Sequence, residues 1–238
     1  MILAAQVKVD GSLITQSGAL VPSDALIEVA GSQRFVSRGG LKLEGALDYF
    51  SFDVAGLCCI DVGTSSGGFT DCLLQRGAAR VTAVDVGYGQ FDWKLRKDDR
   101  VTLFERTHIA KVAPSVLGAP FDVLVADLSF TSLARLAKHL EALLQDKGNS
   151  FSLVKPQFEL PKDVVKDGVV RSFDLHVWAL QTVVESYSNN GLAVQGLGFS
   201  PLLGPKGNIE FWIWAAKDTP AATIDEREVV RQAHRELT

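Results

Sequence analysis

The chain has 238 residues, of which 47% are hydrophobic and 22% are charged, and its formal net charge is -4 at pH 7. This length and composition predict one sizeable α/β domain with a small appendage rather than two full domains. The acidic balance argues against a protein that coats nucleic acid nonspecifically, because such binding neutralises many phosphates. The apolar runs are short and broken by polar residues, which argues against a membrane-spanning helix.

The N-terminal residues favour a cytoplasmic protein, and the cysteines argue against a metal site. The opening sequence MILAAQVKVDG becomes polar too early for a signal peptide, so we expect a cytoplasmic protein without membrane association. Cys58, Cys59 and Cys72 lack the spacing of a metal site, and no metal is expected. Cys58 and Cys59 fall in an apolar run typical of a buried strand, and we interpret all three cysteines as free core thiols.

Strand and helix patterns alternate in chain order from residue 37 onward. The first helix is expected at residues 37–50, with Ser37 as its candidate N-cap. Further helices are expected at residues 67–77, 131–145 and 175–188, with a solvated helix in the tail at 221–238. Seven strands are expected at residues 57–62, 80–85, 101–105, 121–127, 150–155, 192–199 and 208–216.

This order predicts a Rossmann-like α/β fold. Near-continuous apolar strands joined by helices are typical of a mostly parallel sheet that is covered by helices on both faces. Ligands of such sheets bind at the carboxyl ends of the strands, beside the switch in strand order. Residues 1–32 contain too few apolar residues for an independent core, so we expect a small separate segment before a main domain at residues 33–238.

A turn with three glycines follows the first strand of the main domain, in DVGTSSGGFT at residues 61–70. Its spacing is G-x-x-x-G-G and not the G-x-G-x-x-G of NAD enzymes, so we expect a ligand without a pyrophosphate. Asp85 closes the next strand, where a carboxylate can accept both hydrogens of a ribose diol. This pattern favours S-adenosylmethionine. The residues expected to bind it are Asp61, Gly63, Ser65, Gly67, Gly68, Phe69, Asp85 and Asp127.

The alternatives for the two acids are structural. Asp61 could be a turn or helix-capping carboxylate, and Asp85 could be a solvated strand end.

Charged residues mark the ends of three strands. Asp127 and Lys155 each follow an apolar strand, and Glu210 begins the last one. If the last strand is antiparallel, all three lie at one edge of the sheet, and Lys42 on the preceding helix can reach them. Methylation of a hydroxyl requires that the nucleophile be held in line and that its proton be accepted.

These requirements suggest roles for the four residues. Lys155 is interpreted as the base or hydroxyl-polarising group and Asp127 as the residue that orients it. Lys42 and Glu210 are interpreted as positioning groups. A buried salt-bridge network without a catalytic role is the alternative. The sequence DLSF at residues 127–130 lacks the two prolines common in methylases of exocyclic nitrogens, which favours oxygen as the acceptor.

Six segments carry a family resemblance: SRGGLKLEGAL (37–47), DVGTSSGGFTDCLLQRGA (61–78), VDVGYGQ (84–90), ADLSFTSL (126–133), LVKPQFE (153–159) and SPLLGPKGNIEFW (200–212). Together they resemble the FtsJ-like ribosomal RNA 2'-O-methyltransferases of the hemolysin/TlyA type. The resemblance implies that the family's Lys-Asp-Lys-Glu tetrad falls on Lys42, Asp127, Lys155 and Glu210. It also places cofactor contacts on the loop from Asp61 to Gly68 and on Asp85.

The resemblance further implies an N-terminal S4-type RNA-binding domain. VKVDG (7–11) and DALIEV (24–29) are similar to its second half, while its helices have no counterpart in this sequence. A departure occurs in ERTHIA (105–110), where the family more often has ERTNAR. His108 is interpreted either as a contact to adenine or as a simple loop residue.

The predicted function is S-adenosylmethionine-dependent methylation of an RNA ribose 2'-hydroxyl, with ribosomal RNA or ribosomal subunits as partner. Arg34, Arg38 and Lys42 are expected to form a basic strip that binds RNA. A second set of cations is equally well explained as scattered surface charge, namely Lys94, Arg96, Lys97, Arg100, Lys162, Lys166 and Arg171.

Two other functions stay open. A membrane-active cytolysin, as the hemolysin name suggests, requires an amphipathic segment that the sequence lacks. A catalytically silent RNA-binding factor would keep the fold but fail to bind the cofactor.

Overall fold

The computed structural model describes residues 7–14, 16, 18–29 and 34–237, and the chain divides into two compact units, 1–34 and 35–238. The first unit holds an antiparallel sheet with strand order β2-β1-β3. Its strands are β1 (Val7–Val9), β2 (Ser12–Ile14) and β3 (Ile27–Val29). The predicted boundary at residues 32 and 33 lies outside the described residues. The S4-like character of this unit stays a prediction.

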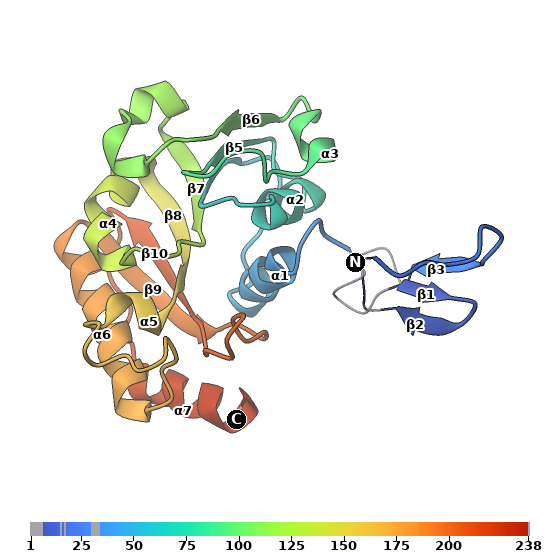
Figure 1. Cartoon of the computed structure of the whole chain (residues 1–238). Coiled ribbons are helices and arrows are strands. Elements are labelled where there is room, and N and C mark those ends of the chain that lie inside the picture. The colour runs from blue at the N-terminus through green and yellow to red at the C-terminus, as the bar shows by residue number, and fades with distance from the viewer. Residues whose placement is uncertain (1–6, 15, 17, 30–33, 238) are drawn as a thin grey trace. The chain divides into compact units, whose positions relative to one another are not determined.

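The second unit is built on a seven-stranded sheet with strand order β6-β5-β4-β7-β8-β10-β9 (Figure 1). The strands are β4 (Cys58–Val62), β5 (Arg80–Val84), β6 (Val101–Phe104), β7 (Phe121–Ala126), β8 (Leu144–Val154), β9 (Leu192–Phe199) and β10 (Phe211–Lys217). All neighbouring strands are parallel except β10, which is antiparallel to β8 and β9. The prediction of a seven-stranded, mostly parallel Rossmann-like fold is confirmed.

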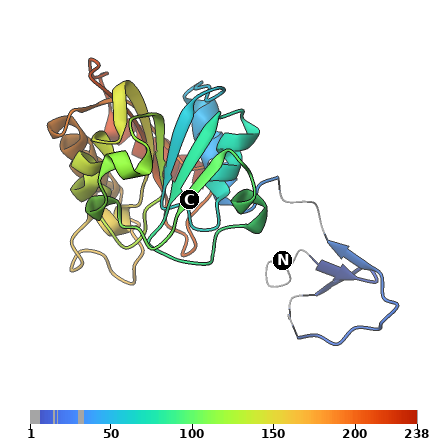
Figure 2. The same cartoon turned by 90° about the horizontal axis from the view of Figure 1, so that it is seen from above.

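Helices cover both faces of this sheet (Figures 1 and 2). One side carries α1 (Gly39–Tyr49), α2 (Gly68–Gln75) and the short α3 (Trp93–Arg96). The other carries α4 (Leu133–Glu141), α5 (Pro156–Glu159) and α6 (Phe173–Asn189), with α7 (Glu226–Leu237) packed against α6 and β9. Two 3-10 turns, η2 (Ile109–Lys111) and η3 (Pro114–Leu117), precede β7.

The central strands bury side chains on both faces, which explains their near-continuous apolar sequences. In β7, Val123 and Val125 pack in the cluster that contains residues of α1 and α2. Leu124 and Ala126 point to the opposite face and pack with residues of α4 and α6.

The cysteines are free, as the sequence predicted. Cys59 and Cys72 are buried in the core, whereas Cys58 is only half-buried at the start of β4. Burial raises the pKa of the Cys59 thiol to about 12, so this group is an inert part of the core.

Several predicted boundaries were wrong. Strand β8 begins at Leu144, because Leu144 pairs with Phe121 before the register shifts to join Val123 with Asn149. Helix α4 therefore ends at Glu141 rather than at residue 145. The N-cap of α1 is Arg38, and Ser37 only accepts a hydrogen bond of 3.3 Å from the Gly39 amide.

The tail helix is also less solvated than expected. It is α7, and it buries Val230 and Ala233 in the same cluster as residues of α6.

Candidate active site

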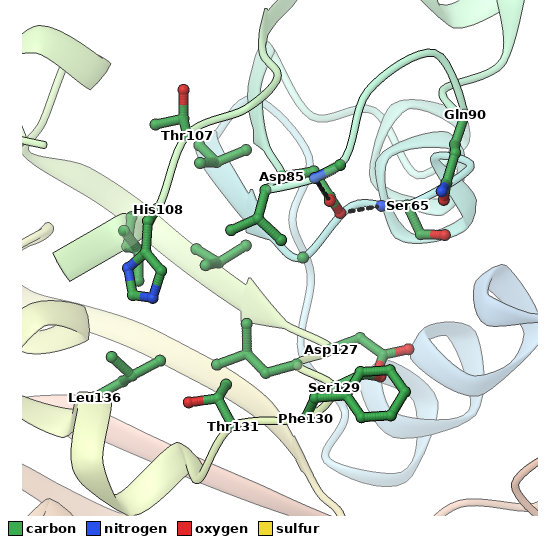
Figure 3. A pocket seen from close by; sticks show the side chains of 17 residues that line it. Ser65, Asp85, Gln90, Thr107, His108, Asp127, Ser129, Phe130, Thr131 and Leu136 are labelled. Carbon is green, nitrogen blue, oxygen red and sulfur yellow. Dashed lines mark hydrogen bonds between the residues drawn. The ribbon is translucent and has the colours of Figure 1, made fainter. Parts of the chain in front are cut away.

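A cavity of about 540 Å³ opens beyond the carboxyl ends of β4, β5, β6 and β7 (Figure 3). The chain runs outward from β4 through β5 to β6 and then returns past β4 to form β7. This reversal of strand order is where doubly wound sheets bind their ligands. The volume lies within the range of small-molecule sites.

The loop between β4 and α2 forms one wall and depends on glycine at two positions. Gly63 has φ of +87°, and a Cβ atom there would lie 2.5 Å from the carbonyl oxygen of Asp127. Gly67 has φ of +94°, and a Cβ atom there would lie 2.4 Å from the Leu95 side chain. Only glycine combines these conformations with such close approaches. The loop is thereby held against the end of β7.

Asp61 lies beneath this loop and is fully buried. Its Oδ2 atom accepts hydrogen bonds from the Thr64 hydroxyl at 2.8 Å and from the Thr70 hydroxyl and backbone amide at 2.7 and 3.0 Å. Burial raises the pKa of Asp61 to about 6, against the lowering effect of these hydrogen bonds. The carboxylate thus fixes the shape of the loop from behind.

The predicted cofactor residues of this loop therefore separate into two groups. Gly63 and Ser65 line the cavity. Asp61, Gly67, Gly68 and Phe69 do not line it, and Phe69 packs on Trp212 with ring centroids 5.6 Å apart. Of this second group, Asp61 and Gly67 shape the loop that carries the lining residues.

Asp85 stands in the cavity wall at the end of β5. Its Oδ2 atom accepts a hydrogen bond of 2.7 Å from the Ser65 amide, and its Oδ1 atom accepts one of 2.6 Å from the Gly87 amide (Figure 3). A carboxylate has about four acceptor positions. Two amides therefore fix the orientation of Asp85 and leave acceptor capacity for a ligand diol.

The cavity continues toward an apolar end formed by Ile109 and Leu136. His108 lines this end, and its Nδ1 atom accepts a hydrogen bond of 3.2 Å from the Ala110 amide. In the neutral ring, the proton is then on Nε2, which can donate a hydrogen bond to a ligand.

Lys155 and Asp127 meet at the opposite side of the cavity. Lys155 Nζ forms an ion pair with Asp127 Oδ1 and donates a hydrogen bond of 3.0 Å to Ser129 Oγ. Lys155 is only 9% exposed, whereas Ser129 is exposed in the cavity wall beside Asp127 (Figure 3). The two partners line the cavity and fix the position of the lysine beside them.

Lys42 and Glu210 form a second buried pair. Lys42 Nζ lies 2.5 Å from Glu210 Oε2, and the two residues are 9% and 1% exposed. Phe211 pairs with Val154 in the antiparallel ladder, so the preceding Glu210 lies beside Lys155 at the same sheet edge. The structure thus brings Lys42, on α1, to the edge that also carries Asp127 and Lys155.

The predicted basic strip looks different in the structure. Lys42 is buried and paired, so it offers no surface charge to RNA, whereas Arg38 is exposed and Arg34 belongs to the first unit. In the second set of cations, Arg96 pairs with Glu105 and Arg100 pairs with Asp98. These two ion pairs agree with the interpretation of the second set as surface cations whose charge is neutralised by nearby acids.

Several residues that line the cavity were not identified from the sequence, among them Val86, Ser129 and Phe130. Val86 directly follows Asp85, and the other two follow Asp127 within three positions. Their positions directly after the acids that end β5 and β7 could have predicted this role, because residues that follow such strands line the ligand crevice of the sheet.

Among the residues that the structure describes, none of the helices combines the length and the apolar composition that a membrane span requires.

Comparison with known proteins gives a consistent family assignment. The chain is 42% identical over 225 residues to a Mycobacterium tuberculosis protein named 16S/23S rRNA (cytidine-2'-O)-methyltransferase TlyA, covering 93% of this chain and 84% of the relative. It is 36% identical over 213 residues to Hemolysin A of Brachyspira hyodysenteriae, covering 89% of each.

A solved structure from Streptococcus thermophilus that carries a hemolysin name shares 39% identity, with a TM-score of 0.86 and coverage of 99% of this chain and 88% of that chain. Residues 35–217 match the FtsJ-like methyltransferase family. The chain therefore belongs to the family of FtsJ-like methyltransferases.

Proposed function

We propose that this chain transfers a methyl group from S-adenosylmethionine to a ribose 2'-hydroxyl of ribosomal RNA. The observation that carries the proposal is Lys155, held between Asp127 and Ser129 at the edge of the cavity. The name of the M. tuberculosis relative, an rRNA (cytidine-2'-O)-methyltransferase, supports ribose oxygen as the acceptor.

The residues of the cavity fit the proposed cofactor. Asp85 would accept the ribose hydroxyls, and the backbone of Gly63 and Ser65 would approach the amino-acid part closely. The apolar end beside Ile109 and His108 suits a flat purine ring. When bound, the cofactor supplies an electrophilic methyl group on a sulfonium.

On the acceptor side, we assign Lys155 as the residue that contacts the 2'-hydroxyl. Asp127 and Ser129 hold its Nζ atom in place, so the hydroxyl is oriented toward the methyl carbon. As a neutral amine, after giving one proton to solvent, Lys155 Nζ would accept the hydroxyl proton while the hydroxyl oxygen takes the methyl group that the bound cofactor would supply, leaving the cofactor as a neutral thioether. Ser129 acts through Lys155 and is a positioning residue.

Lys42 and Glu210 are assigned a positioning role beside this group. Their ion pair ties the first turns of α1 to the segment before β10, next to Lys155 in the ladder. Asp61 has a similar role on the cofactor side, because it fixes the loop that contains Gly63 and Ser65.

RNA binding is proposed to involve the first unit and the exposed Arg38. The three-stranded sheet of the first unit represents, in this proposal, the second half of an S4-like domain at residues 1–32, with the methyltransferase domain at 33–238. Arg34 and Arg38 flank the start of the second unit and would contact phosphates.

The experiment is transfer of labelled methyl from S-adenosylmethionine to ribosomal subunits that lack the modification. Wild type is compared with Lys155→Ala and with Lys155→Arg, which keeps the charge but cannot accept a proton. We expect both variants to lose transfer and to bind the cofactor as wild type does in calorimetry. Activity in the arginine variant would overturn the base role, and activity in the alanine variant would overturn the site.

A further inference from the structure

A second cavity, of about 660 Å³, adjoins the first. Phe130 and Thr131 line both cavities, so the two share a wall. The second cavity extends from this wall between α4, α5 and α6. A ligand group in the second cavity would therefore lie next to a ligand group bound in the first cavity, on the side near Lys155.

The shared wall ends in an aromatic pair. Phe130 is 92% exposed, and its ring centroid lies 5.4 Å from that of Phe158 at an interplanar angle of 46°. Phe158 is half-buried and lines only the second cavity of the two. Single-stranded RNA is bound by stacking of its unstacked bases on such rings.

Two cations add polar recognition. Arg135 on α4 and Lys162 after α5 are exposed and line the cavity. Their charges suit a phosphate of the RNA backbone.

The carboxylate of Glu159 also lines this cavity but is engaged elsewhere. It accepts hydrogen bonds from the Leu133 and Ala134 amides and from the Ser132 hydroxyl, at the N-terminus of α4. Three donors and the helix terminus compensate its charge, so it opposes a nearby phosphate only weakly.

We propose that the second cavity binds the nucleotide next to the methylated one in a single-stranded RNA segment. Its base lies against Phe158, and its phosphate lies between Arg135 and Lys162. This inference rests on the proposed function, because the acceptor ribose is the group that occupies the Lys155 side of the first cavity.

The test is the KM for ribosomal subunits in the full chain. The double variant Arg135→Ala/Lys162→Ala removes both cations, and Lys138→Ala/Lys166→Ala is its matched control. The control residues are exposed, lie on the same two segments and do not line the cavity. The cavity variant is expected to raise KM about ten-fold or more and to lower the salt slope of RNA binding by about 0.7, the value for one phosphate of a single strand. Cofactor affinity should stay at the wild-type value.

A second variant tests the base contact. Phe158→Leu keeps an apolar side chain but removes the stacking surface, and a rise in KM of about ten-fold is expected. The proposed role of the second cavity would be refuted if both double variants changed KM equally and Phe158→Leu left KM unchanged. The proposed methyltransferase function would still stand in that case. Absence of transfer by wild type would overturn both proposals.

Discussion

The buried pair of Lys42 and Glu210 provides a test that separates stability from function. Lys42→Met leaves the Glu210 carboxylate, which is 1% exposed, without the cation 2.5 Å away. Breaking a buried ion pair by removing one partner costs about 3–5 kcal/mol, which for a domain of this size is a fall in Tm of roughly 6–20 °C. We therefore expect a large loss of stability in the single variant.

The second variant, Lys42→Met/Glu210→Gln, also removes the unpaired charge of the Glu210 carboxylate. It should regain most of the stability, with an interaction free energy of at least about 2 kcal/mol in the double-mutant cycle. Methyl transfer should stay at least about 100-fold below wild type in both variants, because neither can position the group beside Lys155.

The assays are thermal unfolding by circular dichroism and methyl transfer at a temperature where all variants are folded. Recovery of both stability and activity in the double variant would refute a positioning role and leave a structural salt bridge. A loss below about 1 kcal/mol in Lys42→Met would refute the claim that the pair is desolvated.

Three further predictions concern single residues. Lys155→Ala should lower the rate of transfer by about 100-fold or more while calorimetric cofactor affinity changes less than about three-fold, and a parallel loss of affinity would contradict the acceptor-side role. Asp85→Ala should weaken cofactor binding by about ten-fold or more, because it removes the proposed diol acceptor, and an unchanged Kd would exclude Asp85 from the site. Burial, and to a smaller extent His234, lowers the pKa of His176 from 6.5 to about 4. As the pH falls, this histidine therefore binds a proton at a higher pH in the unfolded chain than in the folded chain. Wild type should therefore lose up to about 3 kcal/mol between pH 6.5 and 4, and unfolding curves of His176→Leu should show a flatter pH dependence.

The fold could be predicted from the sequence because the strands are apolar on both faces and the turns are marked by glycine and acids. Strand β9 has the predicted bounds, and the antiparallel β10 brings Glu210 to the expected edge. The start of β8 could not be predicted, since the pairing of Leu144 with Phe121 joins polar residues to the strand. Periodicity does not report such long-range pairing.

The sequence was sufficient to predict which site residues lie at the ends of strands. It was not sufficient to predict the direction in which their side chains point. Asp61 and Asp85 both follow the expected pattern, yet Asp61 points into the loop and Asp85 points into the cavity. The difference depends on Thr64 and Thr70, whose hydroxyls bind Asp61. Phe130 escaped notice because an exposed aromatic residue in a loop has no periodic signal.

The most direct test of the central claim is the chemical identity of the methylated product. Ribosomal RNA treated with the wild-type protein and S-adenosylmethionine is digested to nucleosides and analysed by mass spectrometry, with Lys155→Ala as the control. The arrangement of Lys155, Asp127 and Ser129 predicts a 2'-O-methylated nucleoside that is absent from the control. A nucleoside methylated on its base would contradict the account.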